Sequence, residues 1–100
     1  MPYDIKLLGS AAKELRSFRV YDQRRISDGI ENHLRHQPTM ESRNCKCMRG
    51  FSPIFDHVPP VWELRVGDFR VFYDVDEDAQ VVYVRAVRLK EHGKTTEDIT

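Results

Sequence analysis

The run WELRVGDFRVFYDVDEDAQVVYVRAVRLK, residues 62–90, alternates apolar and polar side chains over most of its length. In its middle part Phe69, Val71 and Tyr73 fall on one face, and Arg70 falls on the other. A period of two is the pattern of a β-strand. The run therefore predicts antiparallel strands joined by short connections.

Two breaks divide this run. Gly67 stands in a tight turn, since glycine tolerates the positive φ that a short hairpin needs. The polar residues 76–79 form the second break. We therefore expect strands near residues 62–66, 69–75 and 80–88. Three such strands are stable when a helix packs on one of their faces.

The N-terminal part of the chain predicts one more strand and a helical hairpin. Residues 3–8 (YDIKLL) alternate as a short strand does. We expect a helix from residue 11 to about residue 18, with Ser10 as its N-cap. A second helix should run from residue 20 or 22 to residue 35. Its apolar residues lie four apart on one stripe: Ile26, Ile30 and Leu34.

The remaining segments are less regular. Residues 43–48 have room for a further short strand, whereas the prolines between residues 53 and 60 exclude a long one. In the tail EHGKTTEDIT, Thr95 or Thr96 is the expected start of a short final helix. The sequence thus predicts an α+β fold of order β-α-α-β-β-β with a short C-terminal helix. The first strand and the helical hairpin pack on a small, mainly antiparallel sheet, as one domain over residues 1–100.

The composition is that of an ordinary globular protein: of 100 residues, 40% are hydrophobic and 32% are charged. No apolar run reaches the length of a membrane span, and MPYDIKLLG lacks the long apolar stretch of a signal peptide. We therefore expect a cytoplasmic location and no membrane partner. Cys45 and Cys47 stand one residue apart, which fits neither a disulfide framework nor a structural zinc site. We expect both on one side of a strand, with no metal and no cofactor.

The charges are unevenly distributed, although the formal net charge is zero. A neutral chain is not typical of proteins that bind nucleic acid. The basic residues between positions 13 and 25 are interpreted as a solvated helical face. A second basic cluster lies at the end of the last predicted strand. This cluster favours an anionic partner. Its members are Arg85, Arg88, Lys90 and Lys94.

The strands carry a resemblance to a known family. The motif L-R-x-G-x-[YF]-R-[VL]-x-Y recurs in the RelE/ParE superfamily of toxins from bacterial toxin–antitoxin modules. Residues 64–73, LRVGDFRVFY, fit it throughout. The opening YDIKLLGSAAKEL, the helix DQRRISDGIENHL and the connector PTMESRNCKCM extend the likeness over nearly the whole chain. The chain therefore resembles a RelE/ParE toxin, with the RelE branch favoured.

The resemblance implies two possible targets. RelE-branch members are ribosome-dependent endoribonucleases that cut mRNA in the A site, whereas ParE-branch members poison DNA gyrase. In RelE-type proteins, basic residues on the concave face of the sheet hold the scissile phosphate. The motif arginine is Arg70 here, and the later basic position is Lys90, with Arg88 on the same face. The chain departs from RelE at Glu63 and Val61, which stand in place of lysines, and its tail lacks a tyrosine.

Cleavage of RNA through its own 2′-hydroxyl needs a base, an acid and a cation that stabilises the phosphorane-like transition state. The planar fork of arginine suits the cationic role. We assign this role to Arg70 first, then to Arg65 and Arg88. Arg70 is expected to serve the phosphate and not the core. For Arg65, the alternative is a structural ion pair with a neighbouring acid.

Proton transfer has its own candidates. His92 follows the last strand, and an imidazole titrates near neutral pH; the alternative is an exposed histidine of the tail. Lys90 is a second candidate. Glu63 either replaces lysine chemistry with carboxylate chemistry or pairs with a neighbouring arginine. The predicted catalytic residues are Arg70, Lys90, His92 and Arg65, and the predicted substrate-binding residues are Arg88, Arg85 and Lys94.

Three functions are open at this point. The first, which we favour, is an mRNA interferase that inhibits translation on the ribosome. The second is a ParE-like gyrase inhibitor without nuclease activity, and the third is a degraded toxin that binds only its antitoxin. In each, a cognate antitoxin should bind, through an apolar helix laid on the helical hairpin or a strand added to a sheet edge. The predicted partners are the antitoxin and the ribosome with its mRNA, or alternatively gyrase.

Overall fold

The computed structural model describes residues 2–91 and 93–100. Its centre is a mixed sheet with strand order β1-β5-β4-β3-β2. β1 runs parallel to β5, and the other neighbouring strands are antiparallel. The elements are β1 (Asp4–Leu7), α1 (Ser10–Ser17), α2 (Val20–Leu34), β2 (Cys45–Met48), β3 (Val61–Val66), β4 (Phe69–Asp76), β5 (Val81–Leu89) and the 3-10 turn η1 (Glu97–Ile99).

The predicted α+β order is confirmed. The three strands expected in residues 62–90 are β3, β4 and β5, and the two expected helices are α1 and α2. The optional short strand within residues 43–48 is present as β2, paired with β3 at one edge of the sheet. Among the described residues, no helix is long and apolar enough to cross a membrane.

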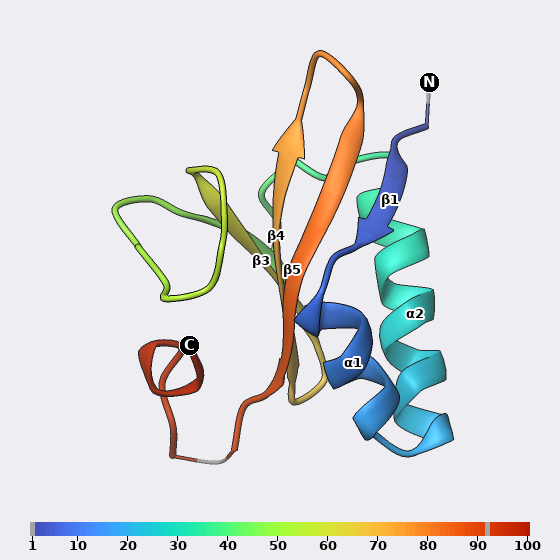
Figure 1. Cartoon of the computed structure of the whole chain (residues 1–100), viewed down its shortest axis with the longest axis vertical. Helices are drawn as coiled ribbons and strands as arrows, with labels where there is room; N and C mark the ends of the chain where they lie inside the picture. Colours follow the sequence, from blue (N-terminus) through green and yellow to red (C-terminus); the bar gives the residue numbers. More distant parts are fainter. Residues whose placement is uncertain (1, 92) are drawn as a thin grey trace.

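Both helices cover one side of the sheet, which we call the helix face (Figure 1). The connection between β2 and β3 and the C-terminal tail lie on the opposite side. On β4 the predicted alternation holds, since Tyr73 belongs to the core of the helix face and Phe72 to a separate apolar cluster. The buried members of the main core are Ala11, Ile26, Ile30, Leu34, Cys45, Trp62, Leu64, Phe69, Val71, Tyr73, Val82, Val84 and Val87.

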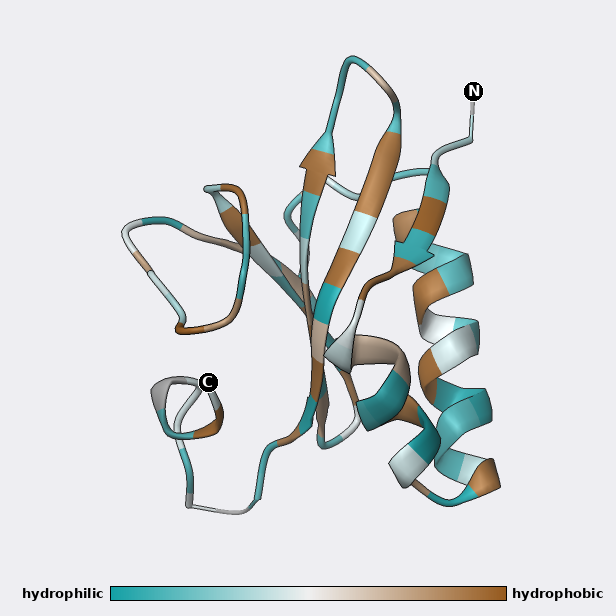
Figure 2. Cartoon of the chain, in the orientation of Figure 1, coloured by the Kyte–Doolittle hydropathy of each residue, from teal (hydrophilic) through white to brown (hydrophobic). Residues whose placement is uncertain are grey.

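α2 packs closely on the sheet. Its stripe of Ile26, Ile30 and Leu34 is buried, and Figure 2 shows hydrophobic segments of α2 toward the sheet and hydrophilic ones on its outer side. A Cβ added at Gly29 would lie 2.8 Å from Val66 Cγ2. A glycine here therefore allows α2 to approach β3 without displacing that side chain.

The structure corrects two expectations about helix ends. Ser10 is the first residue of α1 and not its N-cap; the cap position is Gly9, at φ 43°, and no side chain caps the helix. The N–H of Ala11 is satisfied instead by the carbonyl of Leu8 at 2.8 Å. The expected final helix is only the turn η1; Thr96, one of its two expected starts, stands at the N-cap position but makes no side-chain capping bond. The reason is that the Thr96 hydroxyl is bonded elsewhere, to a side chain of β3.

Candidate functional site

Three arginines are neighbours across the sheet. Arg65 of β3 is directly paired with Arg70 of β4, and Arg70 is paired with Arg88 of β5. We call these residues the arginine row. Like charges that stand directly opposite each other destabilise a sheet. A row of three therefore requires acceptors or anions close by, from the fold or from a ligand.

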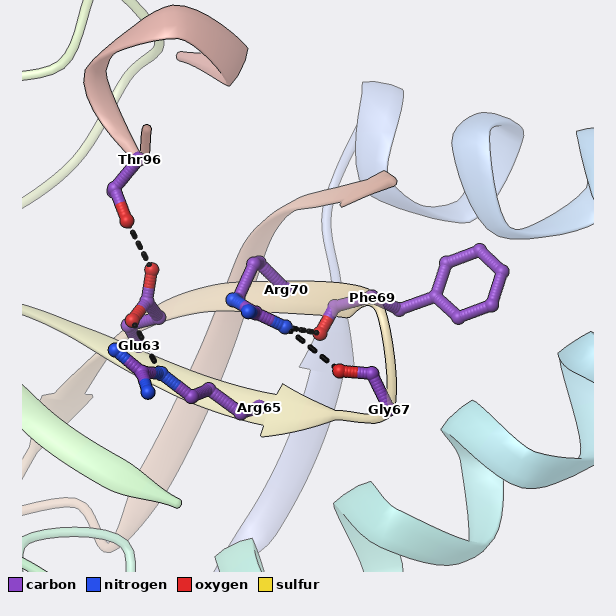
Figure 3. A network of polar contacts seen from close by, with 6 residues as sticks. All are labelled: Glu63, Arg65, Gly67, Phe69, Arg70 and Thr96. Atoms are coloured by element: carbon purple, nitrogen blue, oxygen red, sulfur yellow. Dashed lines mark hydrogen bonds and ion pairs between the residues drawn. The ribbon is translucent and has the colours of Figure 1, made fainter. Parts of the chain in front are cut away.

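Arg70, in the middle of the row, is only 9% exposed. Its Nη1 donates to the carbonyl oxygens of Gly67 at 2.9 Å and Phe69 at 3.0 Å (Figure 3). The expectation that Arg70 stays out of the buried interior is therefore wrong, because its side chain folds back over the β3–β4 turn. Its Nε has no hydrogen-bond partner within residues 2–91 and 93–100. A buried donor without an acceptor is unfavourable.

Glu63 places a carboxylate beside the row. It is 2% exposed, and its Oε2 accepts a hydrogen bond from Thr96 Oγ1 at 2.8 Å (Figure 3). Its Oε1 lies 3.5 Å from Nε of Arg65, whose side chain is 39% exposed. The ion pair foreseen as an alternative for Arg65 is thus present, but it is long and partly solvated. It also uses only one of the five N–H donors of that guanidinium.

Arg88 is held from three sides. Its Nε lies 2.5 Å from Oε2 of Glu14 on α1, an ion pair without hydrogen-bond alignment. Its Nη1 donates to the carbonyl oxygen of Ile99 at 2.7 Å. Its guanidinium carbon lies 5.8 Å from the centre of the Phe55 ring, a cation–π distance. Arg88 is therefore already occupied by groups of the chain itself.

An apolar cluster accompanies the row on this side of the sheet. It consists of side chains from the strands together with side chains from the β2–β3 connection and the tail. The buried members are Val61, Phe72 and Ala86, and the partly buried ones are Phe51, Phe55 and Ile99.

Arg85 is not part of the row. The register of β4 and β5 shifts between Phe72 and Tyr73, so Arg85 has no directly opposite residue in β4. Its Nε and Nη2 donate to Oδ2 and Oδ1 of Asp74 at 2.7 and 3.1 Å. The backbone N–H of Val58 donates to the same carboxylate at 2.9 Å. The predicted substrate-binding residue therefore lies in an ion pair that fastens the β2–β3 connection.

The other predicted site residues follow β5. The N–H of Lys90 donates to the carbonyl of Asp68 at 2.8 Å, which holds the end of β5 beside the β3–β4 turn. The Lys90 side chain is half-buried and Lys94 is exposed. His92 lies outside the described residues. The predicted site residues that the sheet brings together are Arg65, Arg70 and Arg88.

No local sequence pattern indicates the groups that surround the row. Thr96 and Glu63 are 33 residues apart, and Glu14 reaches the backbone of Val87 over 73 residues. Only the packing of α1, the β2–β3 connection and the tail brings such groups together. Within the described ranges, no group of three or more His, Cys, Asp and Glu side chains is placed to hold a metal ion.

Residues 5–92 match the family model described as "ParE toxin of type II toxin-antitoxin system, parDE". The chain belongs to the ParE toxin family. It is therefore the toxin of a type II toxin–antitoxin system, and the resemblance to the RelE/ParE superfamily is confirmed. No curated protein sequence matches this ParE-family chain.

Solved structures similar to this ParE-family toxin include RelE proteins. The archaeal RelE–RelB complex from Pyrococcus horikoshii OT3 contains a chain with TM-score 0.71 and 20% identity, covering 93% of this chain and 100% of that one. The isolated E. coli RelE toxin gives TM-score 0.71 and 22% identity, and the match covers 91% of this chain and 87% of that one. A chain of the RelBE2 complex of Mycobacterium tuberculosis gives TM-score 0.67 and 18% identity, and the match covers 87% of this chain and 96% of that one. At these identities the likeness shows the fold.

Proposed function

We propose that this toxin is a ribosome-dependent mRNA endoribonuclease whose arginine row holds the scissile phosphate. The observation that supports it is the direct pairing of Arg65, Arg70 and Arg88 on adjacent strands. The buried, unpaired Nε of Arg70 in the described part of the chain adds to this support. A guanidinium fork meets two phosphate oxygens at once and stays charged. A phosphate would also neutralise the repulsion within the row.

In the proposed reaction the 2′-hydroxyl attacks the neighbouring phosphorus, and the bond to the 5′-oxygen breaks. Negative charge grows on the non-bridging oxygens in the transition state, where Arg70 and Arg88 stabilise it. A base removes the 2′-proton and an acid protonates the leaving 5′-oxygen. Lys90, directly after β5, and His92 keep these roles as sequence predictions.

We further propose that a cognate antitoxin binds this toxin. Two of the similar structures are RelE–RelB and RelBE2 complexes. The start of α2 presents Val20 and Tyr21, which are 61% and 64% exposed. β1 and β2 are the two edge strands of the sheet. An apolar helix laid on α2 or a strand added at one of these edges are the binding modes that this surface supports.

A specific observation favours gyrase inhibition as the second candidate. All three arginines already have partners in the fold. Arg70 binds the carbonyls of Gly67 and Phe69, Arg88 pairs with Glu14, and Arg65 forms a long ion pair with Glu63. The family model that matches this chain is also described as a ParE toxin. A gyrase inhibitor acts by binding and needs no free cation for a transition state.

One pair of assays separates the two candidates. Single-turnover cleavage of mRNA on a programmed 70S ribosome is measured beside gyrase supercoiling, for the wild type and for Arg70→Ala. We expect cuts in the A-site codon that need the ribosome, and a rate about 10²–10³-fold lower for Arg70→Ala, the cost typical of removing one transition-state donor. Arg24→Ala is the matched control, because Arg24 is exposed on α2 and lies off the row.

Because Arg70 also holds the β3–β4 turn, circular dichroism and urea unfolding must show that Arg70→Ala is folded under assay conditions. Arg70→Lys keeps the positive charge and loses the planar guanidinium fork. We therefore expect its cleavage rate to lie between those of the wild type and Arg70→Ala. Cleavage by folded Arg70→Ala at the wild-type rate contradicts the assigned role. Inhibited supercoiling without cleavage establishes the second candidate, and silence in both assays leaves a toxin that binds only its antitoxin.

A further inference from the structure

The C-terminal tail crosses the arginine row. Thr96 Oγ1 donates to Glu63 Oε2 at 2.8 Å, and the carbonyl of Ile99 accepts from Arg88 Nη1 at 2.7 Å. Glu63 belongs to β3 and Arg88 to β5, so the two contacts stand on either side of β4, the strand of Arg70. Figure 3 shows Thr96 directed from the tail toward Glu63, on the side of the sheet where the Arg70 side chain lies.

Apolar packing also fixes the tail. Ile99 packs against the cluster that contains Phe72. Gly93, at φ 85°, lets the chain reverse after β5 and return over the sheet. The described contacts between tail and sheet include two side-chain hydrogen bonds and one half-buried apolar side chain. Polar contacts of a short irregular segment exchange for other partners more readily than close core packing does.

Through Ile99, the tail offers Arg88 a neutral acceptor. The carboxylate of Asp98 accepts from the N–H of Thr95 at 2.9 Å, within its own turn. What Arg88 receives from Ile99 is a neutral carbonyl. Hydrogen bonds in which both partners are charged are shorter and stronger than bonds to neutral acceptors. A phosphate is therefore a better acceptor for Arg88 than the tail.

We propose that residues 95–100 are an intramolecular cover of the arginine row, which single-stranded RNA displaces when it binds. The cover rests on the proposed phosphate-binding function of the row. In the closed state the tail occupies Nη1 of Arg88 and the Oε2 of Glu63; in the open state Nη1 of Arg88 is released for a phosphate, while its Nε stays beside Glu14. The apparent affinity for RNA is reduced in proportion to the fraction of molecules that are open. The cover lies outside residues 5–92, the part that matches the family model.

The double variant Thr96→Ala/Ile99→Ser removes one hydrogen bond and the apolar anchor and leaves every arginine in place. Its matched control is Thr39→Ala/Ile54→Ser, the same changes at exposed positions. Each protein is titrated with a short fluorescein-labelled single-stranded oligoribonucleotide, followed by fluorescence anisotropy. We expect the cover variant to bind about 10-fold more tightly than the wild type, as for a cover that is open in about a tenth of the molecules. The control should bind as the wild type does.

Hydrogen exchange of the wild type gives a second readout that needs no substitution. The N–H groups of Asp98 and Ile99 donate to the carbonyls of Thr95 and Thr96, and their exchange should accelerate when the oligoribonucleotide binds. A cover variant that binds no more tightly than the wild type overturns the proposal. Tail amides whose exchange does not respond to RNA overturn it as well.

Arg70→Ala in the same titration separates this proposal from the one on which it rests. If Arg70→Ala loses RNA binding while the cover variant gains none, the phosphate site stands and only the cover is refuted. If Arg70→Ala binds RNA as the wild type does, the phosphate site is refuted and the cover with it.

Discussion

The two faces of the sheet are built differently. The helix face is filled by apolar side chains that two regular elements press together; Ile26, Leu64 and Val71 are completely buried there. The opposite face carries charges in register, and irregular segments cover it through hydrogen bonds such as that of Thr96 to Glu63. Dense apolar packing resists change, whereas polar contacts of loops exchange for other partners at lower cost. The helix face therefore supplies stability, and the opposite face is suited to binding.

The largest expected effect is a loss of stability from the helix face. Leu64 is completely buried in the main core, so Leu64→Ala should lower the free energy of unfolding by about 2–5 kcal/mol. Leu89→Ala is the matched control, because Leu89 is 43% exposed at the end of β5. Urea unfolding measures both. Cleavage per folded molecule should stay unchanged for Leu64→Ala, and an equal loss of stability in the two variants contradicts the contrast between the faces.

A smaller loss of stability is expected on the opposite face, at the ion pair that holds the β2–β3 connection. Asp74 is 2% exposed and holds Arg85 and the N–H of Val58. Asp74→Asn keeps the shape and leaves the Arg85 charge without its partner. We expect a loss of about 2–3 kcal/mol, below the 3–5 typical of a buried pair, because the Arg85 side chain is 16% exposed. The exposed Asp78→Asn is the control.

Urea unfolding again gives the free energy, and hydrogen exchange shows where the structure loosens. Amides of the β2–β3 connection should exchange faster in Asp74→Asn, while amides of α2 keep their protection. Faster exchange in α2 would mean that the two faces are coupled more tightly than their different construction implies.

The sequence predicted the helix face well because its signals are local. Alternation along residues 69–75 and the spacing of Ile26, Ile30 and Leu34 each indicate one element and the side it buries. The family motif and the chemistry of arginine selected the three arginines as candidates, but their pairing across three strands was not predicted. The burial of Arg70 did not follow, since it depends on how one side chain folds back onto the carbonyls of its own turn.

The tail was the least predictable part of the candidate site. Thr96 was recognised only as a possible helix cap, whereas its hydroxyl is used on Glu63, 33 residues away. A polar residue has several possible partners at short range, and the sequence does not show which of them the packing selects. For the same reason Glu14 and Ile99, which occupy Arg88, had no signal in the chain.

The smallest expected effect is the dependence of the free energy of unfolding on pH, which arises from two ionisable side chains of the helix face. Cys45 Sγ lies 2.9 Å from Tyr73 Oη, which donates to the carbonyl of Pro38 at 2.5 Å. Burial raises the pKa of both the Cys45 thiol and the Tyr73 hydroxyl above their ordinary values of 9.0 and 10.0. Above the ordinary thiol pKa the unfolded chain releases protons that the folded chain keeps. The free energy of unfolding is therefore fully retained below about pH 9 and decreases as the pH rises further.

At about pH 10 we expect a lower free energy of unfolding than at about pH 8, measured by urea unfolding across the alkaline range. In Cys45→Ala this loss should shrink, because only the tyrosine contribution is left. Cys47→Ala keeps Cys45 and should retain the wild-type dependence on pH. If the free energy of unfolding of Cys45→Ala decreases with pH as steeply as that of the wild type, the buried thiol ionises as readily in the folded protein as in the unfolded one. The helix face would then accommodate a charge, and apolar packing alone would no longer separate it from the arginine row.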